Sequence, residues 1–135
     1  MICLDTDVVS ATMRAHAPLH LIRRLAAVPK DEQCTTAVTL AELTYGAAKR
    51  QSAVIAADIE RVVASAGAVL PFDREAAEVY GPLRARLERE GRALAAPDLQ
   101  IASIALARDL TLITGNVRHF GRVPGLRVEN WLTAT

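Results

Sequence analysis

Four side chains of this 135-residue chain could together hold a divalent cation: Asp5, Glu42, Asp98 and Asn116. Their carboxylate and amide oxygens are the type of ligand that Mg²⁺ takes in proteins. Carboxylates held close together raise each other's pKa, and a cation removes that electrostatic cost. A metal held in this way can bridge phosphate oxygens and lower the pKa of an attacking water. The chemistry indicated is therefore metal-assisted attack of water on a phosphate.

Short apolar or β-branched runs predict strands that end beside several of these side chains. Residues 2–4 form a continuous apolar run that stops at Asp5, which is typical of a parallel strand buried on both faces. Residues 33–38 are rich in Thr and Val, and they lie shortly before Glu42. Further strands are predicted over residues 68–72, 110–114 and, as a short fifth strand, 126–128.

Helix signals fill the segments between the predicted strands. Thr39 and Glu42 have the spacing of a capping box, so a helix is expected to begin at Thr39. Helix-compatible sequence continues to Ser65, with a break near residues 50–52, and residues 18–28 carry an apolar stripe at helical spacing. The residues expected to begin, bend or end the remaining helices are, in chain order, Pro18, Asp73, Gly81, Pro82, Gly91 and Pro97.

This alternation of strands and helices predicts an α/β fold with a parallel sheet and helices on both faces. The length is that of one domain. In such sheets the functional site lies outside the carboxyl ends of the strands. Asp5, Glu42 and Asn116 are then expected at one edge of the sheet, and Asp98 joins them if the N-terminus of its helix reaches that edge.

Each of the four side chains also has a purely structural explanation. Glu42 is the acid of the capping box, and Asp98 lies in a helical first turn, where the macrodipole favours an acid. Asn116 suits a turn after Gly115, and Asp5 could cap a following helix. Their joint placement at strand ends, rather than any single residue, favours a functional site.

The composition excludes several classes of protein. Hydrophobic residues make up 51% of the chain, which excludes a disordered protein. The net charge of +1 excludes nucleic-acid or membrane binding by bulk charge. Aromatic residues make up only 4%, which argues against a base-stacking platform of the RRM or OB type.

Location and cysteine chemistry are predicted from what the sequence lacks. It has no apolar run of about 18 residues and no basic segment of the kind that begins a signal peptide, so a cytoplasmic location is expected. Cys3 and Cys34 have no metal-binding spacing, and each sits in a short apolar run. We expect both to be buried free thiols.

Four segments occur in the order seen in PIN-domain proteins: Leu4-Asp5-Thr6, Leu40-Ala41-Glu42-Leu43, Pro97-Asp98-Leu99-Gln100-Ile101-Ala102 and Leu112-Ile113-Thr114-Gly115-Asn116. With the stretch from Asn116 to Trp131, the chain resembles the VapC toxins of prokaryotic VapBC toxin–antitoxin pairs over essentially its whole length. The resemblance implies a single PIN-like domain over residues 1–135, a three-layer α/β/α sandwich with a five-stranded parallel sheet. It also implies a Mg²⁺- or Mn²⁺-dependent endoribonuclease that cleaves tRNA or other translation-linked RNA.

The resemblance assigns roles to the acidic residues. Asp5, Glu42 and Asp98 match the family's acidic metal ligands, with Asp5 and Asp98 holding the metal directly. Glu42 would complete the metal's shell or orient the attacking water. The family often has a further acid near the end of the fourth strand, where this chain has Asn116 and then His119.

Two threonines and three arginines are expected around these residues. Thr6 and Thr114 could hydrogen-bond the carboxylates from positions next to them in the strand ends. Because the net charge is small, attraction of RNA must come from local cations, for which Arg92, Arg118 and Arg122 are the candidates, with Arg127 as a further alternative. In the helix predicted to end at Gly91, two i,i+4 pairs are expected, Arg84 with Glu88 and Arg86 with Glu90.

Partners are also implied. The resemblance implies a homodimer and a cognate VapB-type antitoxin that covers the acidic site. The helical sequence after the second predicted strand carries more apolar surface than a small domain needs, which favours a partner groove there. Tyr45, Tyr80 and Trp131 are expected to pack in the core or at an interface.

Two other functions compete with the nuclease. Asp5-Thr6-Asp7 after an apolar strand resembles haloacid-dehalogenase-type phosphatases, with Asp5 as nucleophile, Asp7 as general acid and Thr114 as a phosphate-binding residue. That family needs a later lysine and a late acidic pair, but no lysine follows Lys49 and no acid lies between residues 109 and 129. The third possibility is a non-catalytic interaction module.

Overall fold

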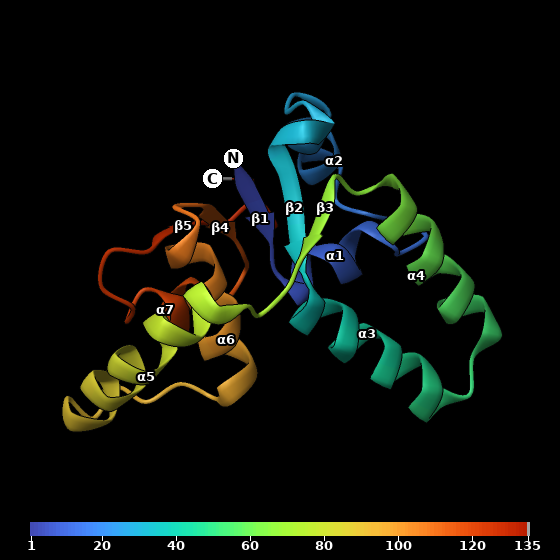
Figure 1. The fold of residues 1–135 in the computed structure, drawn as a ribbon. Helices are drawn as coiled ribbons and strands as arrows, with labels where there is room; N and C mark the ends of the chain where they lie inside the picture. Colours follow the sequence, from blue (N-terminus) through green and yellow to red (C-terminus); the bar gives the residue numbers. More distant parts are fainter. Residues whose placement is uncertain (135) are drawn as a thin grey trace.

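The computed structural model describes residues 1–134 as a five-stranded sheet flanked by helices (Figure 1). The strands are β1 (Ile2–Leu4), β2 (Gln33–Thr36), β3 (Ala68–Leu70), β4 (Thr111–Ile113) and β5 (Arg127–Glu129). The helices are α1 (Thr6–Thr12), α2 (Leu19–Ala26), α3 (Ala37–Arg50), α4 (Ala53–Ser65), α5 (Arg74–Arg89), α6 (Ala96–Ala107) and α7 (Val117–Phe120), with one 3₁₀ turn, η1 (Lys30–Glu32).

Every strand pair in the sheet is parallel, in the order β3-β2-β1-β4-β5. The central strand β1 pairs with β2 through Cys3 and Cys34 and with β4 through Leu4 and Ile113. The carboxyl ends of β1 and β4 therefore lie side by side, so the residues that follow them are neighbours. This pairing positions the candidate site.

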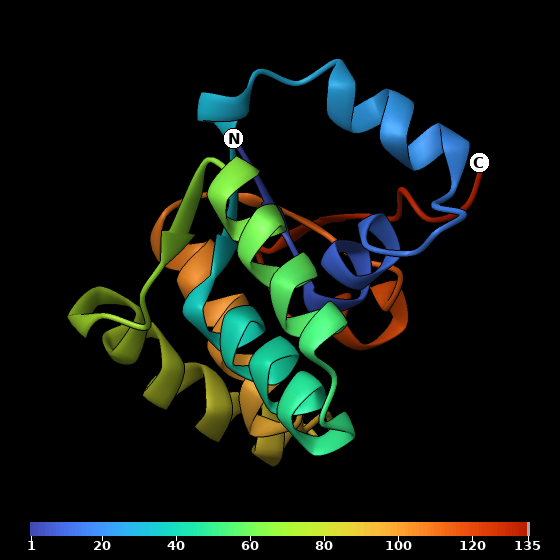
Figure 2. The same ribbon diagram turned by 90° about the vertical axis from the view of Figure 1, so that its right-hand side faces the viewer.

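The two faces of the sheet are buried by different helices, because neighbouring residues of each strand point to opposite faces. Leu112 of β4 packs with residues of α5, α6 and α7, whereas the next residue, Ile113, packs with residues of α1 and α2. The arrangement is a three-layer α/β/α sandwich, which confirms the predicted fold class. Figure 2 shows α3 and α4 lying side by side as a helical hairpin.

All five predicted strands are present, but their bounds differ. The predicted strands over 33–38 and 68–72 end early, at Thr36 and Leu70, and β5 begins one residue later than expected. Helix α1 was not predicted from the sequence, because Val8 and Val9 give it little intrinsic helix propensity. It forms because Asp5 caps it and its apolar side chains are buried in the core. The short helix α7 likewise lies in a predicted loop.

The prediction that a capping box of Thr39 and Glu42 begins α3 is wrong. The helix begins at Ala37, because the Thr36 hydroxyl accepts a hydrogen bond from the Thr39 N–H at 3.1 Å and so caps it. Glu42 is consequently the sixth residue of the helix and lies beyond its first turn. The presence of an acidic residue at position 42 is therefore not explained by helix capping.

Other helix ends confirm the sequence signals. Helices α3 and α4 are separated by Gln51, which has a left-handed φ of 52°, and by Ser52, which caps α4. Asp73 caps α5, which runs through Pro82. The turn after α5 contains Gly91, whose φ is +67°. Pro18 precedes α2 as its N-cap residue instead of occupying its first turn.

The cysteine prediction is confirmed, since Cys3 and Cys34 are both buried free thiols. Trp131 is buried in the core as expected, and Tyr80 packs against the core, but Tyr45 is 65% exposed and does not pack there. Within residues 1–134, no helix is long and apolar enough to cross a membrane.

Gly67, directly before β3, lies so close to the backbone of residues 30 and 33 that we expect a side chain there to destabilise the fold. An alanine Cβ there would overlap the carbonyl oxygens of Lys30 and Gln33. We expect Gly67→Ala to lower the free energy of unfolding by roughly 1–3 kcal/mol, measured by urea denaturation. Gly46→Ala is the matched control, because a Cβ there meets nothing within 4 Å and α3 should gain roughly 0.5–1 kcal/mol. A Gly67→Ala protein as stable as the parent would contradict the packing described.

Candidate active site

Asp5 is the centre of the candidate site. It follows β1, caps α1, and is only 5% exposed. Its Oδ1 accepts a hydrogen bond from the Thr6 N–H at 2.8 Å, and its Oδ2 accepts one from the Thr114 hydroxyl at 2.8 Å. Thr114 can reach it because the backbone N–H of Asp5 bonds to the Ile113 carbonyl at 3.0 Å and so fixes the register of the two strand ends.

Asp7 lies beside Asp5 in the first turn of α1. Its Oδ2 accepts a hydrogen bond from the Gly115 N–H at 2.9 Å, and its Oδ1 lies 3.5 Å from the Thr114 hydroxyl. The Asp7 carboxylate therefore fixes the turn that follows β4. In the sequence, Asp7 is a candidate only for the phosphatase alternative, although its position two residues after a strand-end acid is a usable signal.

Asp98 is the third residue of α6, so the N-terminus of that helix does reach the same edge of the sheet. Burial raises the pKa of the Asp98 carboxyl, and the nearby negative charge of Asp7 raises it further. A positive charge on the ring of His119 acts in the opposite direction and lowers this pKa. Asp98 is thus in electrostatic contact with residues of both α1 and α7.

Glu42 is joined to the site through a hydroxyl group. The Thr6 hydroxyl donates to Glu42 Oε1 at 3.0 Å and lies 3.1 Å from the Thr39 hydroxyl. Because the Thr6 N–H also bonds Asp5, this one residue connects Asp5 and Glu42, two of the three predicted metal ligands. Glu42 itself is exposed, in contrast to Asp5.

Asn116 lies at the same edge, directly before α7. Its backbone N–H donates to the Thr114 hydroxyl at 3.0 Å, and its side-chain nitrogen lies 2.8 Å from His119 Nδ1. Since an amide nitrogen can only donate, Nδ1 accepts and the ring proton of neutral His119 resides on Nε2. The side chain of Asn116 thus orients an imidazole beside Asp98.

The pKa of Asp5 is raised from 3.8 to about 6. Burial is the largest cause, while the hydrogen bonds from Thr114 and Thr6 lower it and the negative charges of Asp7 and Asp98 raise it. The carboxylates of Asp7 in α1 and Asp98 in α6 therefore both act on Asp5 at the end of β1. This is the electrostatic environment in which a bound cation would be stabilised most.

The sequence model of the PIN domain family matches residues 2–126. The chain belongs to the PIN domain family. This confirms the family resemblance found in the sequence, and it places the acidic cluster in a fold that the family shares.

Curated relatives span nearly the whole of this PIN domain. The tRNA(fMet)-specific endonuclease VapC of Salmonella typhimurium is 37% identical over 133 residues, covering 95% of this chain and 96% of the relative. Ribonuclease VapC2 of Haemophilus influenzae is 32% identical over 134 residues, covering 96% of each.

Solved structures agree with the fold. VapBC2 from Rickettsia felis, bound to a DNA fragment from its promoter, has a TM-score of 0.87 at 29% identity and covers 97% of this chain and 99% of that chain. DNA-bound VapBC from Salmonella typhimurium has a TM-score of 0.85 at 32% identity, covering 97% of this chain and 99% of that chain.

The donor set fits a hard divalent cation. Within residues 1–134, no three His, Cys, Asp or Glu side chains converge closely enough to hold a metal by themselves. Mg²⁺ keeps several of its waters and is usually bound through one or two carboxylates, so a complete protein cage is not required. Burial is the main cause of the raised pKa values of Asp5 and Asp98, and the charge of Asp7 raises both further. A bound cation would stabilise the ionised form of these carboxyls.

The arginines predicted to bind RNA differ in whether their guanidinium groups already have partners within the protein. Arg118 is exposed on α7, next to His119. Arg122 donates to the Ala93 carbonyl at 3.2 Å, and the guanidinium of Arg92 lies 3.9 Å from the Glu90 carboxylate. Arg127 is paired with the Asp109 carboxylate at 3.0 Å. The structure therefore leaves Arg118 most available to a ligand. The predicted i,i+4 pairs of α5 are present, Arg84 with Glu88 at 3.2 Å and Arg86 with Glu90 at 3.1 Å.

The raised pKa of Asp5 predicts an unusual pH dependence of stability. Between pH 3.8 and about 6 the folded protein keeps a proton that the unfolded chain has released. The stabilising contribution of protonated Asp5 is therefore complete at low pH and is lost as pH rises through about 6. In EDTA at pH 8, Asp5→Asn is expected to raise the free energy of unfolding by up to about 3 kcal/mol, with little gain near pH 4.

The matched control is Asp73→Asn. Asp73 is also a helix N-cap, but its pKa is lowered, chiefly by the hydrogen bond from the Ala76 N–H. This variant should lose stability relative to the parent as pH rises, which is the opposite sign. Denaturation at pH 4, 6 and 8 tests both variants, and a gain for Asp5→Asn that is the same at every pH would contradict the assignment.

Proposed function

We propose that this PIN domain is a metal-dependent endoribonuclease toxin of the VapC type, neutralised by a VapB-type antitoxin. The observation that carries the proposal is the buried Asp5 carboxylate at the carboxyl edge of a parallel sheet, whose pKa is raised chiefly by burial and further by the charges of Asp7 and Asp98. The curated relatives named as ribonucleases support the nuclease over the phosphatase.

Asp5 and Asp98 are the residues we assign to a Mg²⁺ or Mn²⁺ ion, with Glu42 completing its shell or orienting water. The ion, when bound, would lower the pKa of the attacking water and neutralise charge on the scissile phosphate. The remaining residues position these groups. Thr114 holds Asp5, and Thr6 connects Asp5 with Glu42.

Asp7 and the pair Asn116–His119 complete the site. Asp7 holds the 114–115 turn through the Gly115 N–H, so it sets where the Thr114 hydroxyl lies. His119, oriented by Asn116, directs its Nε2–H away from that hydrogen bond. We assign to this N–H a hydrogen bond to a phosphate oxygen of the substrate, in place of the further acid that the family often has.

The substrate that we propose is a tRNA. The Salmonella relative is named as specific for tRNA(fMet), and the Haemophilus relative as a ribonuclease. Arg118, Arg122 and Arg92 are the proposed phosphate contacts, with Arg118 the principal one because it is exposed beside the site. A cytoplasmic location, expected from the sequence, stays a prediction.

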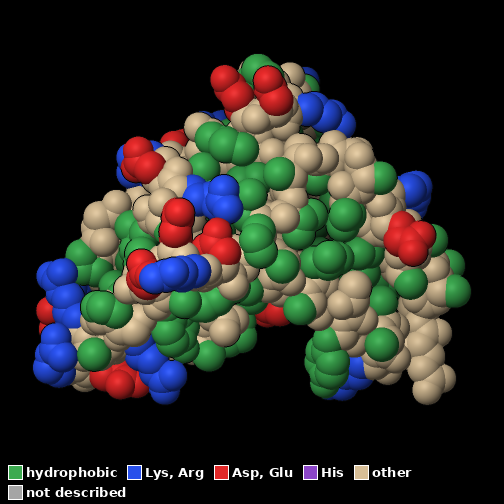
Figure 3. All heavy atoms as spheres, viewed as in Figure 1, with side chains coloured by type: hydrophobic (Ala, Val, Ile, Leu, Met, Phe, Trp, Pro, Cys, Tyr) green, Lys and Arg blue, Asp and Glu red, His purple; other side chains and the backbone are tan. Residues whose placement is uncertain are grey.

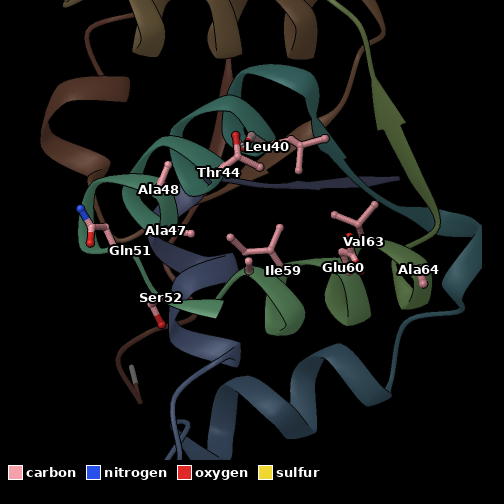
Figure 4. A pocket seen from close by; sticks show the side chains of 11 residues that line it. Leu40, Thr44, Ala47, Ala48, Gln51, Ser52, Ile59, Glu60, Val63 and Ala64 are labelled. Carbon is pink, nitrogen blue, oxygen red and sulfur yellow. Dashed lines mark hydrogen bonds between the residues drawn. The ribbon is translucent and has the colours of Figure 1, made fainter. Parts of the chain in front are cut away.

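The antitoxin is proposed to bind the groove between α3 and α4. The groove has a volume of about 660 Å³ (Figure 4), and Leu40, Ala47, Ile59 and Val63 give it an apolar lining. An amphipathic helix binds such a groove through its apolar face. The matched solved structures are VapBC complexes, which supports an antitoxin as the occupant. A homodimer is proposed on the family resemblance.

Cleavage of RNA tests the proposed function directly. Purified protein should cleave tRNA with Mg²⁺ or Mn²⁺ and lose activity in EDTA, and Asp5→Ala should abolish cleavage. Thr114→Val, which removes only the hydroxyl that holds Asp5, should lower kcat/KM by roughly 10–100-fold and raise the metal concentration needed for half-maximal rate. Cleavage that survives both EDTA and Asp5→Ala would exclude the metal-nuclease mechanism, and turnover of a small phosphomonoester would favour the phosphatase.

The role of Arg118 has its own test in RNA binding. Arg118→Ala should weaken tRNA binding and reduce the slope of log Kd against log salt concentration by about 1, as expected for the loss of one phosphate contact. Arg84→Ala is the control, because Arg84 is already paired with Glu88 on α5. Equal changes in slope for the two variants would show that Arg118 makes no particular contact.

A further inference from the structure

One aromatic side chain of the protein stands apart from the core. Phe72 and Tyr80 pack edge to face with ring centroids 5.6 Å apart, and Phe120 and Trp131 are buried. Tyr45 is 65% exposed. Aromatic side chains with a polar tip are enriched at binding surfaces, because they bury a large area and can also form a hydrogen bond.

Tyr45 lies in a hollow that adjoins the carboxylate site. The hollow has a volume of about 440 Å³ and is lined by Ala37, Val38, Ala41, Glu42, Tyr45, Pro97 and Gln100. It therefore lies between α3 and the start of α6. Figure 3 shows a notch at the lower edge of the molecule, with acidic side chains at its roof.

Two of the lining residues connect the hollow to the site. Glu42 accepts the Thr6 hydrogen bond and lines the hollow, and Pro97 is the residue before Asp98. Tyr45 is three residues after Glu42 in α3, so the two side chains share one face of the helix. A substrate whose phosphate lies at the carboxylates would place a neighbouring nucleotide against this face.

Lys49 adds a cation to the same face. It lies four residues after Tyr45, and its Nζ is 5.9 Å from the centroid of the Tyr45 ring. In the described part of the chain, this ammonium forms no salt bridge with a carboxylate. The surface thus offers a flat aromatic face, a positive charge and the Gln100 amide beside an acidic catalytic edge.

We propose that this hollow is a subsite for one unpaired nucleotide of the RNA substrate, whose base stacks on Tyr45 and whose phosphate contacts Lys49. The inference rests on the proposed ribonuclease function and specifies how that site recognises its substrate. A base within a helix has no free face to stack on a side chain, so the subsite selects RNA with an unstacked nucleotide next to the cleaved bond. One such contact is sequence-tolerant, because every base has a π-face.

The test measures binding rather than cleavage. Fluorescence anisotropy of a labelled oligoadenylate of about 12 nucleotides would be measured with the Asp5→Asn protein in EDTA. Adding Tyr45→Ala to this protein should weaken binding roughly 5- to 100-fold, as expected for the loss of one stacked base. Tyr45→Trp and Tyr45→Phe should retain binding, whereas Tyr45→Leu should lose it.

Two controls separate stacking from other effects. An abasic ribose–phosphate oligomer of equal length should bind equally to proteins with and without Tyr45→Ala. Leu19→Ala removes an apolar side chain of similar exposure, 60%, on the distant helix α2, and it should change nothing. Lys49→Ala should reduce the salt dependence of binding for both oligomers.

Several outcomes would overturn the subsite. They are unchanged affinity in Tyr45→Ala, equal loss in Tyr45→Ala and Tyr45→Phe, or a change in oligomeric mass that makes this surface an interface between copies. Because the readout needs no catalysis, a protein that binds through Tyr45 but cleaves no RNA would refute the nuclease and retain the subsite. A protein that cleaves RNA but binds the oligomer equally well after Tyr45→Ala would support the nuclease and refute the subsite.

Discussion

The burial of one carboxylate at the end of a parallel strand is the constraint on which the rest of this structure depends. Asp5 carries its charge in a position that is only 5% exposed, where desolvation opposes ionisation. Two hydrogen bonds oppose that cost, one from the first N–H of α1 and one from the Thr114 hydroxyl. The first is local to the start of α1, whereas the second exists only because β1 and β4 are parallel neighbours in register. The topology of the sheet therefore determines how far the charge of Asp5 is stabilised.

The other acids increase this cost instead of relieving it. Asp7 and Asp98 both raise the pKa of Asp5, and they come from two helices that each begin at the same edge. A fold optimised for stability alone would not gather three carboxylates there. The arrangement is understandable if a cation and a phosphate complete it, because the stability lost without the ion becomes affinity for the ion.

The sequence was most informative where a residue's role follows from strand ends. Asp5 and Asp98 were placed correctly because a buried strand and a Pro-initiated helix have clear sequence signals. The start of α3 was misplaced because Thr36 and Thr39 are both acceptable caps, and only the early end of β2 decides between them. The role of Asp7 is not visible in the sequence, because its contact with Gly115 joins residues 108 positions apart and depends on α1, which has weak local helix propensity.

Net charge and aromatic content describe the whole chain, whereas RNA binding depends on where single charged and aromatic residues lie. Many arginines are neutralised by ion pairs, on α5 above all, so the small net charge says little about the catalytic edge, where Arg118 is exposed. The low aromatic content excludes a broad stacking platform but not a single ring at the right place. Tyr45 could not be distinguished from a core residue by sequence, because the packing of α6 against α3 decides which face of α3 stays open. A small domain can thus recognise RNA with a few residues, provided that the sheet edge brings them to one phosphate.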